Sequence, residues 1–524
     1  MTSTETIFPE EIFQLGERAL GRQEQRTLDH YWVEKSGLPL LLLMEQAAAA
    51  AFHYLRLQVL HSESKILLLA GPGMNGGDAW ALARQLLSFS PRISVIDFCP
   101  QKSLGKEAET MRSAAFRMGL PIFPAEESAD FWSGLERPDF IIEGMLGTGF
   151  SLERPLSAAM VQASVQLKMW QKQGSRVISL DLPAGVEATS GGVDPAVVQA
   201  DLTLSFVLSK TGLCNMPGAA FAGRIEVLPI GLPLTEETLA LSENHLRLIN
   251  LAMAKSLLPQ ENNFGHKGER GRLALFAGCP EMPGGLRLCL EAALVTGPGY
   301  LYLSTDKELE PSIICDFPET ITGQDAAAAA TVIAAGPAWG QRRSRMTKIL
   351  ELIEGNKPLV LDADAINVLA TFPDAVSLLR KRAERLGEGS VLLTPHPGEA
   401  ARLCPDLLPR MKHDRVETAR EMAARFAAVV LLKGACTVIA LPDGRAFVLP
   451  IASAALSRAG SGDVLTGLIS GFSTRGMSLA MAAVLGAYVH GKAAVQAASE
   501  KGSASVRSAD LALYAARVIR QLGS

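Results

Sequence analysis

A short segment near the C-terminus combines a phosphate-binding turn with an acid. Residues 458–467 read Arg-Ala-Gly-Ser-Gly-Asp-Val-Leu-Thr-Gly, and the apolar run over 464–472 predicts a helix that starts there. Backbone N–H groups at a helix N-terminus attract anions, and glycines let a phosphate approach the backbone closely. Asp463 could take a proton from an attacking hydroxyl, so the segment predicts phosphoryl transfer. The alternative is that Asp463 only caps the helix.

A second Gly-rich segment lies far upstream. Gly71, Gly73 and Gly76 form GxGxxG between the apolar residues 66–70 and a helical pattern over 79–89, which suits a diphosphate. A plain strand-to-helix turn has the same pattern. Two more loops, over 143–149 and 181–186, also follow strand patterns. Because ligands of open α/β sheets bind at strand ends, three such loops favour a second site.

The elements that must position these loops repeat in both halves of the chain. A length of 524 residues predicts two domains. Short apolar strand patterns alternate with helical stretches at 66–70, 93–97, 140–142, 177–180 and 202–206, then at 273–276, 332–334, 359–361, 391–393 and 429–432. This rhythm predicts two α/β domains, each a parallel sheet between helical layers, with a boundary at 235/236. Residues 235–263 read as a polar, helical connector, and 480–498 as a buried or interface helix.

Composition excludes several classes of protein. Hydrophobic residues make up 48% and charged residues 20%, and the net charge of -4 argues against nucleic acid or an anionic membrane as the main partner. The apolar run over residues 38–44 is too short to span a bilayer. Residues 1–13 carry no basic residue, whereas a signal peptide begins with a positively charged segment. Seven cysteines without a CxxC pair predict reduced thiols in the cytoplasm. Eight histidines without HExxH argue against zinc.

The upstream loops carry a family resemblance. Residues 43–47 (Leu-Met-Glu-Gln-Ala), 74–78 (Met-Asn-Gly-Gly-Asp), 143–149 and 181–186 resemble the epimerase domain of the NAD(P)H-hydrate repair proteins. The resemblance implies a Rossmann-like three-layer domain in which Asp181 moves protons at C6 of the hydrated nicotinamide, while the 147–153 loop holds its phosphates. It places the hydrate against Met74, Asn75, Gly76, Gly77, Asp78, Gly147, Thr148, Gly149 and Asp181.

Three positions depart from that family pattern. Met74 stands where the family has Asn, Glu143 where it has Asp, and Ala184 where it has Ser. The resemblance makes Asn75, Glu143 and Ala184 the positions of a potassium ion. A hard cation prefers oxygen ligands, and alanine provides no hydroxyl. The departures leave two hypotheses open: an epimerase that still works, and a weakened or lost one whose domain is kept for its fold or interface.

The downstream half carries denser motifs. Residues 336–340 (Gly-Pro-Ala-Trp-Gly), 361–367 (Leu-Asp-Ala-Asp-Ala-Ile-Asn), 393–399 (Leu-Thr-Pro-His-Pro-Gly-Glu) and 433–437 (Lys-Gly-Ala-Cys-Thr) each follow a strand pattern. With 458–467, they resemble the ribokinase-like dehydratase domain of the same repair family over most of 263–515. That resemblance implies transfer of a phosphoryl group from ADP, or from ATP, to the hydroxyl of the hydrate. Loss of phosphate then restores the nicotinamide ring, with Asp463 as the catalytic base.

The resemblance also assigns binding residues in this half. It implies that the adenine nucleotide contacts Lys433, Gly434, Ala435, Cys436, Thr437, Gly460, Ser461 and Gly462, and that the hydrate contacts Ala293, Gly340, His396 and Asp463. Simpler roles remain open for several of these residues. His396, between two prolines, could be a rigid loop residue, and Lys433 an exposed lysine at a strand end.

Two acids and one substitution complete the downstream pattern. Asp362 and Asp364 could hold a Mg²⁺–nucleotide, or act as a helix cap and a partner for a basic side chain. Ala452 replaces an asparagine that the family usually has upstream of the anion loop.

The sequence therefore predicts a two-domain enzyme for repair of hydrated nicotinamide nucleotides. Residues 1–235 are expected to be the epimerase domain and 236–524 the dehydratase domain. The expected ligands are NADHX or NADPHX and an adenine nucleotide, with Mg²⁺ and K⁺ as cofactors and a homo-oligomer as the assembly. One alternative is a ribokinase-type kinase of a small molecule, and another is an active dehydratase with a non-catalytic N-terminal binding module.

Overall fold

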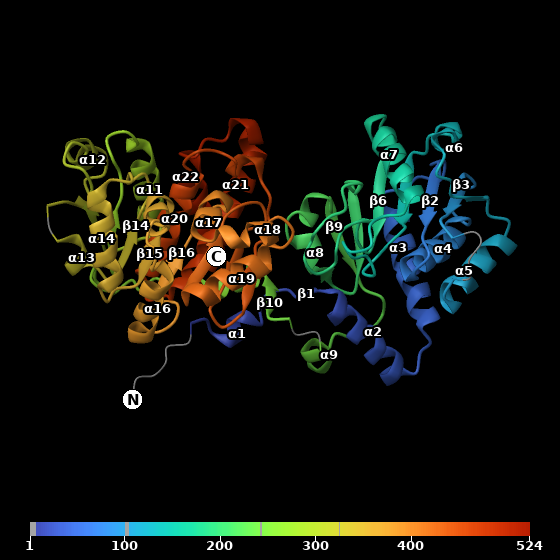
Figure 1. The fold of residues 1–524 in the computed structure, drawn as a ribbon, viewed down its shortest axis with the longest axis horizontal. Helices are drawn as coiled ribbons and strands as arrows, with labels where there is room; N and C mark the ends of the chain where they lie inside the picture. The colour runs from blue at the N-terminus through green and yellow to red at the C-terminus, as the bar shows by residue number, and fades with distance from the viewer. Residues whose placement is uncertain (1–6, 100–103, 242–243, 324) are drawn as a thin grey trace. The chain divides into compact units, whose positions relative to one another are not determined.

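The computed structural model describes residues 7–99, 104–241, 244–323 and 325–524. They form two compact units, each built around its own sheet (Figure 1). We call Arg18–Asn244, together with Lys412–Asp414, the 18–244 unit. The 245–524 unit comprises the described residues up to Glu17, His245–Met411 and Arg415–Ser524. The sequence predicted one boundary at 235, whereas the chain passes between the units after Glu17 and again after Asn244.

The 18–244 unit contains a seven-stranded sheet in which all neighbouring strands are parallel, in the order β4-β3-β2-β5-β6-β7-β9. The strands are β2 (Ile66–Ala70), β3 (Ile93–Asp97), β4 (Ile122–Pro124), β5 (Phe140–Gly144), β6 (Arg176–Leu180), β7 (Leu202–Phe206) and β9 (Arg224–Leu228). A separate two-stranded pair joins β1 (Ala19–Leu20) to β8 (Ser209–Lys210). The sheet switches direction between β2 and β5, which places the ligand edge at the loops that follow them.

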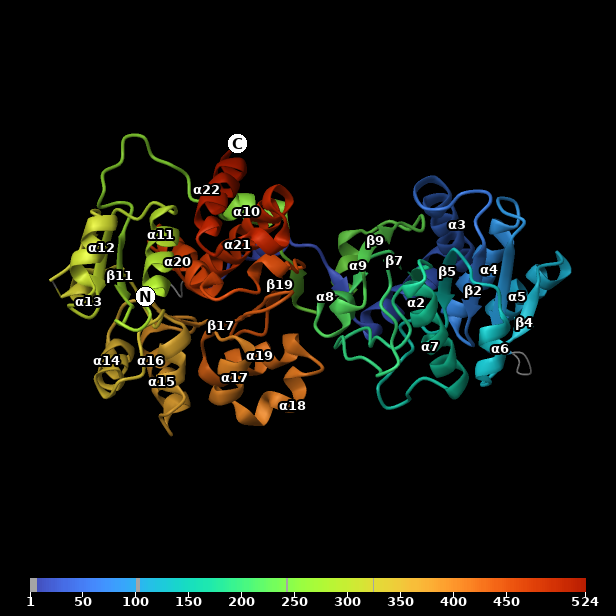
Figure 2. The ribbon, with the colours of Figure 1, turned by 90° about the horizontal axis from the view of Figure 1, so that it is seen from above.

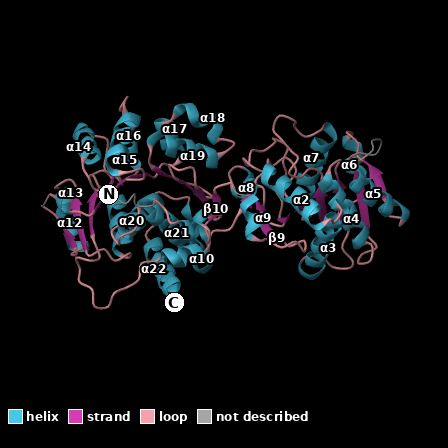
Figure 3. Ribbon diagram, turned by 90° about the horizontal axis from the view of Figure 1, so that it is seen from below, coloured by secondary structure: helices cyan, strands magenta, loops and turns pink. Residues whose placement is uncertain are grey.

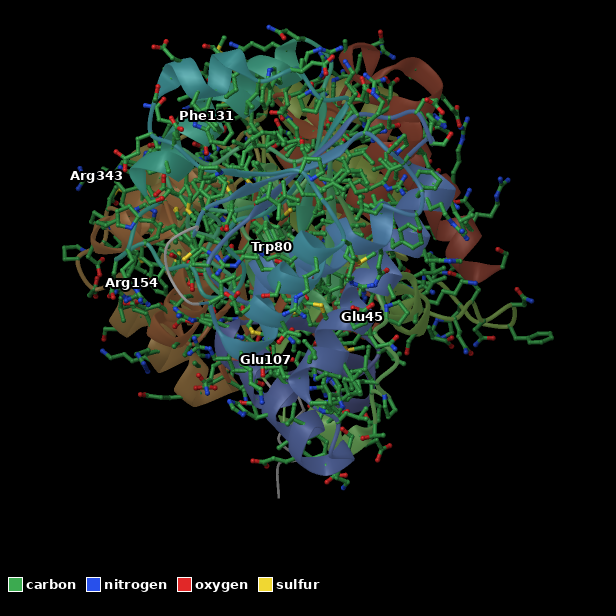
Figure 4. All side chains as sticks on the ribbon, turned by 90° about the vertical axis from the view of Figure 1, so that its right-hand side faces the viewer. Glu45, Trp80, Glu107, Phe131, Arg154 and Arg343 are labelled. Atoms are coloured by element: carbon green, nitrogen blue, oxygen red, sulfur yellow. The ribbon has the colours of Figure 1, made fainter. Side chains whose placement is uncertain are left out.

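Helices cover both faces of this sheet because its strands are apolar on both sides. Ile66 and Leu68 of β2 pack in one cluster with Trp80, whereas Leu67 and Leu69 pack in another with Trp132. Trp80 and Phe131 mark the two faces in Figure 4. The first face carries α3 (Leu40–Gln58), α4 (Met74–Leu86) and α5 (Lys106–Arg117), and the second carries α6 (Ala129–Gly134) and α7 (Ala158–Lys172). The remaining helices are α2 (Arg22–Ser36), α8 (Thr211–Cys214), η1 (Gly218–Ala220) and α9 (Glu236–Leu241).

The 245–524 unit contains a ten-stranded sheet in the order β10-β19-β18-β17-β16-β15-β14-β11-β12-β13. Its strands are parallel except for β18, which runs antiparallel to both of its neighbours. They are β10 (Leu246–Leu248), β11 (Arg272–Phe276), β12 (Tyr300–Ser304), β13 (Thr320–Ile321), β14 (Val332–Ala335), β15 (Leu359–Leu361), β16 (Val391–Leu393), β17 (Val429–Leu432), β18 (Val438–Ala440) and β19 (Ala446–Val448).

Two helical layers enclose this sheet, as Figures 2 and 3 show from opposite sides. One layer holds α10 (Leu251–Leu257), α11 (Pro283–Leu294), α20 (Ser461–Ser473), α21 (Leu479–Lys501) and α22 (Asp510–Gly523). The other holds α14 (Arg343–Glu354), α15 (Ala363–Leu369), α16 (Ala375–Leu386), α17 (Pro397–Leu403) and α19 (Arg415–Phe426). Shorter segments are α1 (Glu10–Phe13), α12 (Glu310–Asp316), α13 (Ala326–Ala329), η2 (Pro405–Leu407), α18 (Leu408–Met411), η3 (Ala454–Leu456) and η4 (Ser503–Ser505).

Every strand that the sequence predicted is present, and both domains are α/β with largely parallel sheets, as expected. The predicted helix over 480–498 is α21, and its side chains are mostly buried in the core of the unit. The prediction for 235–263 is wrong in one respect. Leu246–Leu248 is a buried edge strand of the ten-stranded sheet, paired with β19, rather than part of a connector. Three residues are too few to produce a readable alternation.

No single helix within the described ranges is long and apolar enough to cross a bilayer. The pair α2 and α3 reaches the required length and composition only together, across a bend of 115°.

Arg382, on α16, connects this helix to the C-terminal end of α14. Its buried guanidinium donates hydrogen bonds to the carbonyls of Leu352 and Ile353 in the last turn of α14, and to those of Gly355 and Lys357 after it. We predict that Arg382→Met lowers the unfolding free energy of the 245–524 unit by about 2–4 kcal/mol, because it leaves buried carbonyls without donors. Calorimetric transitions of the full chain measure the effect.

Arg343→Met is the matched control for this prediction, since Arg343 is an exposed arginine on α14 (Figure 4). A surface change of this kind is expected to alter stability by less than about 0.5 kcal/mol. Equal losses in the two variants would contradict the assigned role of Arg382.

Candidate active sites

The sheet of the 245–524 unit changes direction at β11, because β12 lies on one side of it and β14 on the other. Ligands of open α/β sheets bind at such a switch, outside the carboxyl ends of the strands. The loops there are close together: the Gly278 N–H donates to the Pro337 carbonyl at 3.0 Å. Gly336 has φ 123°, and a Cβ on it would lie 1.7 Å from the Asp362 carbonyl oxygen. Glycine at this position therefore lets adjacent strand ends converge.

Asp362 organises this edge of the sheet. Its Oδ1 accepts hydrogen bonds from Lys433 Nζ at 2.5 Å and Thr394 Oγ1 at 2.8 Å, and its Oδ2 accepts one from Thr466 Oγ1 at 2.7 Å. The carboxylate is buried and stands at the N-cap of α15, but it makes no capping hydrogen bond. The sequence left open whether Asp362 holds a metal–nucleotide, caps a helix or pairs with a basic side chain. The geometry matches the last of these roles, with Lys433 as the partner. Asp362 thereby links the ends of β15, β16 and β17 to α20.

Asp463 lies in the first turn of α20, where Gly460 with φ 89° turns the chain into the helix. A Cβ on Gly285, at the start of α11, would lie 2.9 Å from Asp463 Oδ2, so two helix starts meet at this carboxyl group. Burial, followed by the Asp362 carboxylate, raises the pKa of Asp463 to about 7, whereas Lys433 lowers it. The N-cap of α20 is Gly460, so Asp463 is not the cap. A carboxyl group that titrates near neutral pH suits a general base.

Lys433 is enclosed rather than exposed at its strand end. Burial lowers the pKa of Lys433, but Asp362 and Glu399 outweigh this and raise it overall. Its Nζ lies 3.7 Å from Glu399 Oε2, and a Cβ on Gly462 would lie 3.5 Å from Nζ. The ammonium group therefore lies beside the amides at the start of α20, where an anion would bind.

Arg415 supports the loop that follows β17, and sequence reasoning missed it. Its guanidinium, almost fully buried, donates to the carbonyls of Leu432 at 3.1 Å, Lys433 at 2.7 Å and Ala435 at 2.9 Å. These contacts fix the loop after β17, in which Cys436 has φ 51°. The sequence carries no local signal for this contact, because Arg415 belongs to a different element, at the start of α19.

His396 caps α17. Its Nδ1 accepts the N–H groups of Gly398 at 2.9 Å and Glu399 at 3.2 Å, while Glu399 accepts the N–H of His396 at 2.8 Å. This is a reciprocal capping box. Since Nδ1 is an acceptor, a neutral ring carries its proton on Nε2, 3.2 Å from Glu399 Oε1. The ring is 49% exposed at the same sheet edge, so the hydrate contact stays a prediction.

Gly340 is held at this edge as well, since its N–H donates to Asp364 Oδ2 at 2.8 Å. Ala293 is different. It is 0% exposed and packs within the interface of α11 and α20, where Gly467 and Gly471 of α20 approach its backbone. The side chain of Ala293 therefore serves helix packing, and its contact with the hydrate stays a prediction from the resemblance. The motif placed it on α11 but could not tell which face of that helix it occupies.

The 18–244 unit has a cavity of about 680 Å³ at the carboxyl ends of β2 and β5. It is lined by most of the predicted hydrate residues, namely Met74, Asn75, Asp78, Gly147, Thr148, Gly149 and Asp181, with further walls from α2 and α3. Gly76 and Gly77 do not line it. A Cβ on Gly76 would lie 1.9 Å from the Gly71 carbonyl oxygen, and one on Gly77 would lie 2.3 Å from Met44 Cε. These two glycines let α4 pack closely, which is a structural role.

Asp181 is paired with a buried lysine that sequence reasoning missed. Lys210 is 0% exposed, and its Nζ lies 2.6 Å from Asp181 Oδ1. The same ammonium donates to Ser205 Oγ at 3.2 Å and to the carbonyls of Phe206 and Leu208 at 3.0 and 3.1 Å. Asp181 itself has φ 64°, a strained value for a residue with a Cβ. Such strain, held by a buried ion pair on a cavity wall, is typical of functional sites.

Two further carboxyl groups face the same cavity. Burial raises the pKa of Asp29 on α2 to about 6, although its hydrogen bond with Gln25 opposes the shift. Burial, and then the charge of Asp181, raise the pKa of Asp78 well above its usual range. Asp29 was not predicted, because it lies more than 40 residues upstream of the first glycine loop. Two carboxyl groups with raised pKa values therefore lie in the same cavity as the ion pair of Asp181 and Lys210.

The residues at the expected potassium positions do not fit a cation. Glu143 is buried, and its carboxylate accepts the N–H of Ala184 at 2.9 Å and that of Met145 at 3.3 Å. Ala184 provides a methyl group within an apolar cluster. Asn75 uses its amide N–H groups on the carbonyls of Leu146 and Leu180. The oxygens that these three side chains offer are the two of Glu143, each already accepting an N–H group, and Oδ1 of Asn75, whereas a hard cation such as Ca²⁺ takes six to eight oxygen ligands.

Comparisons with known proteins agree over both units. One family model, described as NAD(P)H-hydrate dehydratase, matches residues 273–517, and another, described as YjeF-related protein N-terminus, matches residues 41–212. The curated "Bifunctional NAD(P)H-hydrate repair enzyme Nnr" of Moorella thermoacetica is 33% identical over 525 residues, covering 95% of this chain and 96% of that protein. Its namesake from Escherichia coli is 29% identical, covering 92% of this chain and 90% of that protein.

A solved structure is similar to the 245–524 unit. The ADP/ATP-dependent NAD(P)H-hydrate dehydratase of Bacillus subtilis, co-crystallized with ATP/Mg²⁺, is 31% identical, with a TM-score of 0.47, covering 52% of this chain and 98% of that chain.

The raised pKa of Asp463 predicts a pH-dependent cost in stability. A carboxyl group with a folded pKa of about 7 and an unfolded value near 3.8 makes the native state lose stability as pH rises between these two values. Asp463→Asn removes this loss. We predict that the stability advantage of Asp463→Asn over the unaltered chain grows by about 2–3 kcal/mol between pH 5 and pH 7.

Thermal unfolding at several pH values measures the difference, with Asp374→Asn as control because Asp374 is an exposed carboxylate at the start of α16. Parallel stability curves for Asp463→Asn and the unaltered chain would contradict the assigned environment of Asp463.

Proposed function

Because this chain belongs to the family of bifunctional NAD(P)H-hydrate repair enzymes, we propose that it restores NADH and NADPH from their hydrated forms. The 18–244 unit interconverts the R and S hydrates, and the 245–524 unit dehydrates the S form at the expense of an adenine nucleotide. The observation that carries the proposal is the convergence of Asp463, Lys433 and the start of α20 at one sheet edge. A base, a cation and the backbone amides of a helix start are the parts that phosphoryl transfer needs.

In the dehydration step, the hydroxyl oxygen at C6 of the hydrate attacks the terminal phosphorus of the nucleotide. Asp463 accepts the proton of that hydroxyl, and the bond from phosphorus to its bridging oxygen breaks, which releases AMP when the donor is ADP. Lys433 and the amides of Gly460–Gly462 stabilise the charge on the transferred group. Phosphate then leaves C6, and loss of a proton from C5 forms the C5–C6 double bond. The net reaction converts hydrate and ADP into reduced nucleotide, AMP and phosphate.

Magnesium fits this site as an ion carried on the phosphates. Bound Mg²⁺ would neutralise phosphate charge, and such ions usually take only one or two carboxylates from the protein. Asp362 is paired with the Lys433 ammonium and accepts two hydroxyl groups, whereas Asp364 accepts, among the described residues, only the Gly340 N–H and the exposed Gln341 amide, so Asp364 is the carboxylate that we assign to it. In the part of the chain that the structure describes, no group of three or more His, Cys, Asp or Glu side chains could hold a metal by itself. ADP and ATP both satisfy this arrangement.

In the epimerisation step, the C6–O bond breaks as the N1 lone pair expels the hydroxyl, which needs a proton. Water then adds to C6 from the opposite ring face and loses a proton. We assign Asp78 as the acid, because its pKa is raised, and Asp181 as the base, with Lys210 balancing its charge. The alternative of a non-catalytic binding module explains the altered Glu143 and Ala184, but not a strained, ion-paired aspartate on a cavity wall.

Two further expectations remain proposals. Seven cysteines that form no disulfide in the described part of the chain, six of them buried, fit a reducing compartment such as the cytoplasm. A homo-oligomer is proposed from the family resemblance alone, and mass photometry tests it.

The two activities provide a reciprocal test of the proposal. We predict that Asp463→Asn lowers the dehydration rate about 10²–10⁴-fold while R-to-S conversion stays normal, and that Asp181→Asn does the reverse. Separated R and S hydrates are incubated with ADP or ATP and Mg²⁺. Dehydration is followed by the return of reduced-nicotinamide absorbance and epimerisation by chiral separation of the hydrates.

Each variant is the matched control for the other, since each removes one carboxylate from one unit. Unaltered chain that restores only the S hydrate, with R converting no faster than it does without protein, would favour the binding-module alternative. No restoration from either hydrate would refute the proposed function.

A further inference from the structure

We propose that the 18–244 unit works without a potassium ion, because Glu143 and Ala184 together replace the cation with hydrogen bonds inside the protein. The inference concerns the site of the proposed epimerase activity. It stands on the local donor set and can be tested without turnover, so it can fail while the proposed function holds, or the reverse.

The first step of the argument is the position of the Glu143 carboxylate. Glu143 lies at the end of β5, buried, with Oε1 on the Ala184 N–H and Oε2 on the Met145 N–H. These contacts join the loop after β5 directly to the loop after β6. A cation shared by two such loops would do the same by accepting oxygen ligands from both. Here the connection is already made, because both N–H groups donate to the Glu143 carboxylate and each of its oxygens already serves one of them.

The second step is the loss of an oxygen at position 184. Ala184 is 5% exposed and belongs to an apolar cluster with Met145, Leu156 and Val198. Its methyl group therefore contributes to packing and provides no ligand. The backbone N–H of Ala184 faces the carboxylate. Neither the methyl group nor the N–H of Ala184 can therefore bind a cation.

The third step concerns Asn75, the remaining expected ligand. Its Nδ2 donates to the carbonyls of Leu146 at 3.1 Å and Leu180 at 2.9 Å, so the backbone oxygens of these two residues already accept hydrogen bonds. Its Oδ1 is a buried oxygen without a partner among the described residues. One amide oxygen is far from the six to eight oxygens that a large hard cation such as Ca²⁺ takes.

Glu143 and Ala184 therefore act as a matched pair. The extra methylene of glutamate, relative to aspartate, carries the carboxylate to the Ala184 N–H. Shortening residue 143 and adding a hydroxyl at 184 reverses both changes at once. The double variant Glu143→Asp/Ala184→Ser should consequently regain an oxygen-rich site between the two loops.

The test measures the melting temperature of the 18–244 unit, within the full chain and without substrate, in KCl and in choline chloride at equal ionic strength. We expect the unaltered chain to melt within about 1 °C in the two salts, because a ligand stabilises only the protein that binds it. We expect the double variant to melt about 2–4 °C higher in KCl. Ala188→Ser, which adds a hydroxyl at another buried alanine of the unit, should behave as the unaltered chain.

Equilibrium dialysis with radioactive Rb⁺, a potassium surrogate, decides the matter independently of folding of the variant. No saturable binding to the unaltered chain supports the proposal. Saturable binding that KCl displaces, or a selective rise of its melting temperature in KCl, would overturn it. A double variant that folds but gains no response to KCl would overturn the assignment to Glu143 and Ala184.

Discussion

Both sites of this protein depend on a buried ammonium group that faces a carboxylate at the end of a parallel sheet. In one unit, Lys433 Nζ lies 2.5 Å from Asp362 Oδ1. In the other, Lys210 Nζ lies 2.6 Å from Asp181 Oδ1. Burying an ion pair costs several kcal/mol per ion unless further hydrogen bonds compensate. Here they do: hydroxyl groups saturate Asp362, and backbone carbonyls saturate Lys210. The remaining carboxyl groups of each site titrate in the field of these pairs.

That constraint explains why Asp463 and Asp78, two of the three carboxyl groups assigned to proton transfer, have pKa values above those of surface acids. Asp463 is buried beside Asp362, and these two causes raise its pKa to about 7. The charge of Lys433 limits this rise. Asp78 and Asp29 are enclosed beside Asp181 in the same way. The two units therefore reach acid–base chemistry at neutral pH by one physical route, although their sheets differ in strand number and order.

Sequence reasoning was most successful where the signal is local. The alternation of apolar strands and helices, and the loops after them, placed Asp463, Lys433 and Asp181 at strand ends or a helix start, and the structure agrees. It failed where a role depends on what lies across the fold. Lys210 lies in a two-residue strand that pairs with β1, almost two hundred residues earlier in the chain, and Arg415 contacts a loop from another element.

The orientation of single residues on a helix has the same limit. Ala293 lies on the predicted helix, but the sequence of α11 could not show that this residue packs against α20. Gly76 and Gly77 looked like ligand contacts, yet they serve helix packing. At Glu143 and Ala184, the sequence showed that ligand oxygens were altered, but only the structure shows that the longer carboxylate reaches the Ala184 amide.

The most direct test of the account is the pH profile of kcat/KM for dehydration of the S hydrate, measured for the unaltered chain and for Lys433→Met. Asp463 must be ionised to act as the base, so kcat/KM should rise about tenfold per pH unit at low pH and level off near pH 7. Removing the ammonium group that lowers the pKa of Asp463 should move this inflection to higher pH, whatever it does to nucleotide affinity. A profile that is flat from pH 5 to 9, or an inflection at the same pH in both proteins, would contradict the claim that the buried lysine sets the charge of the site.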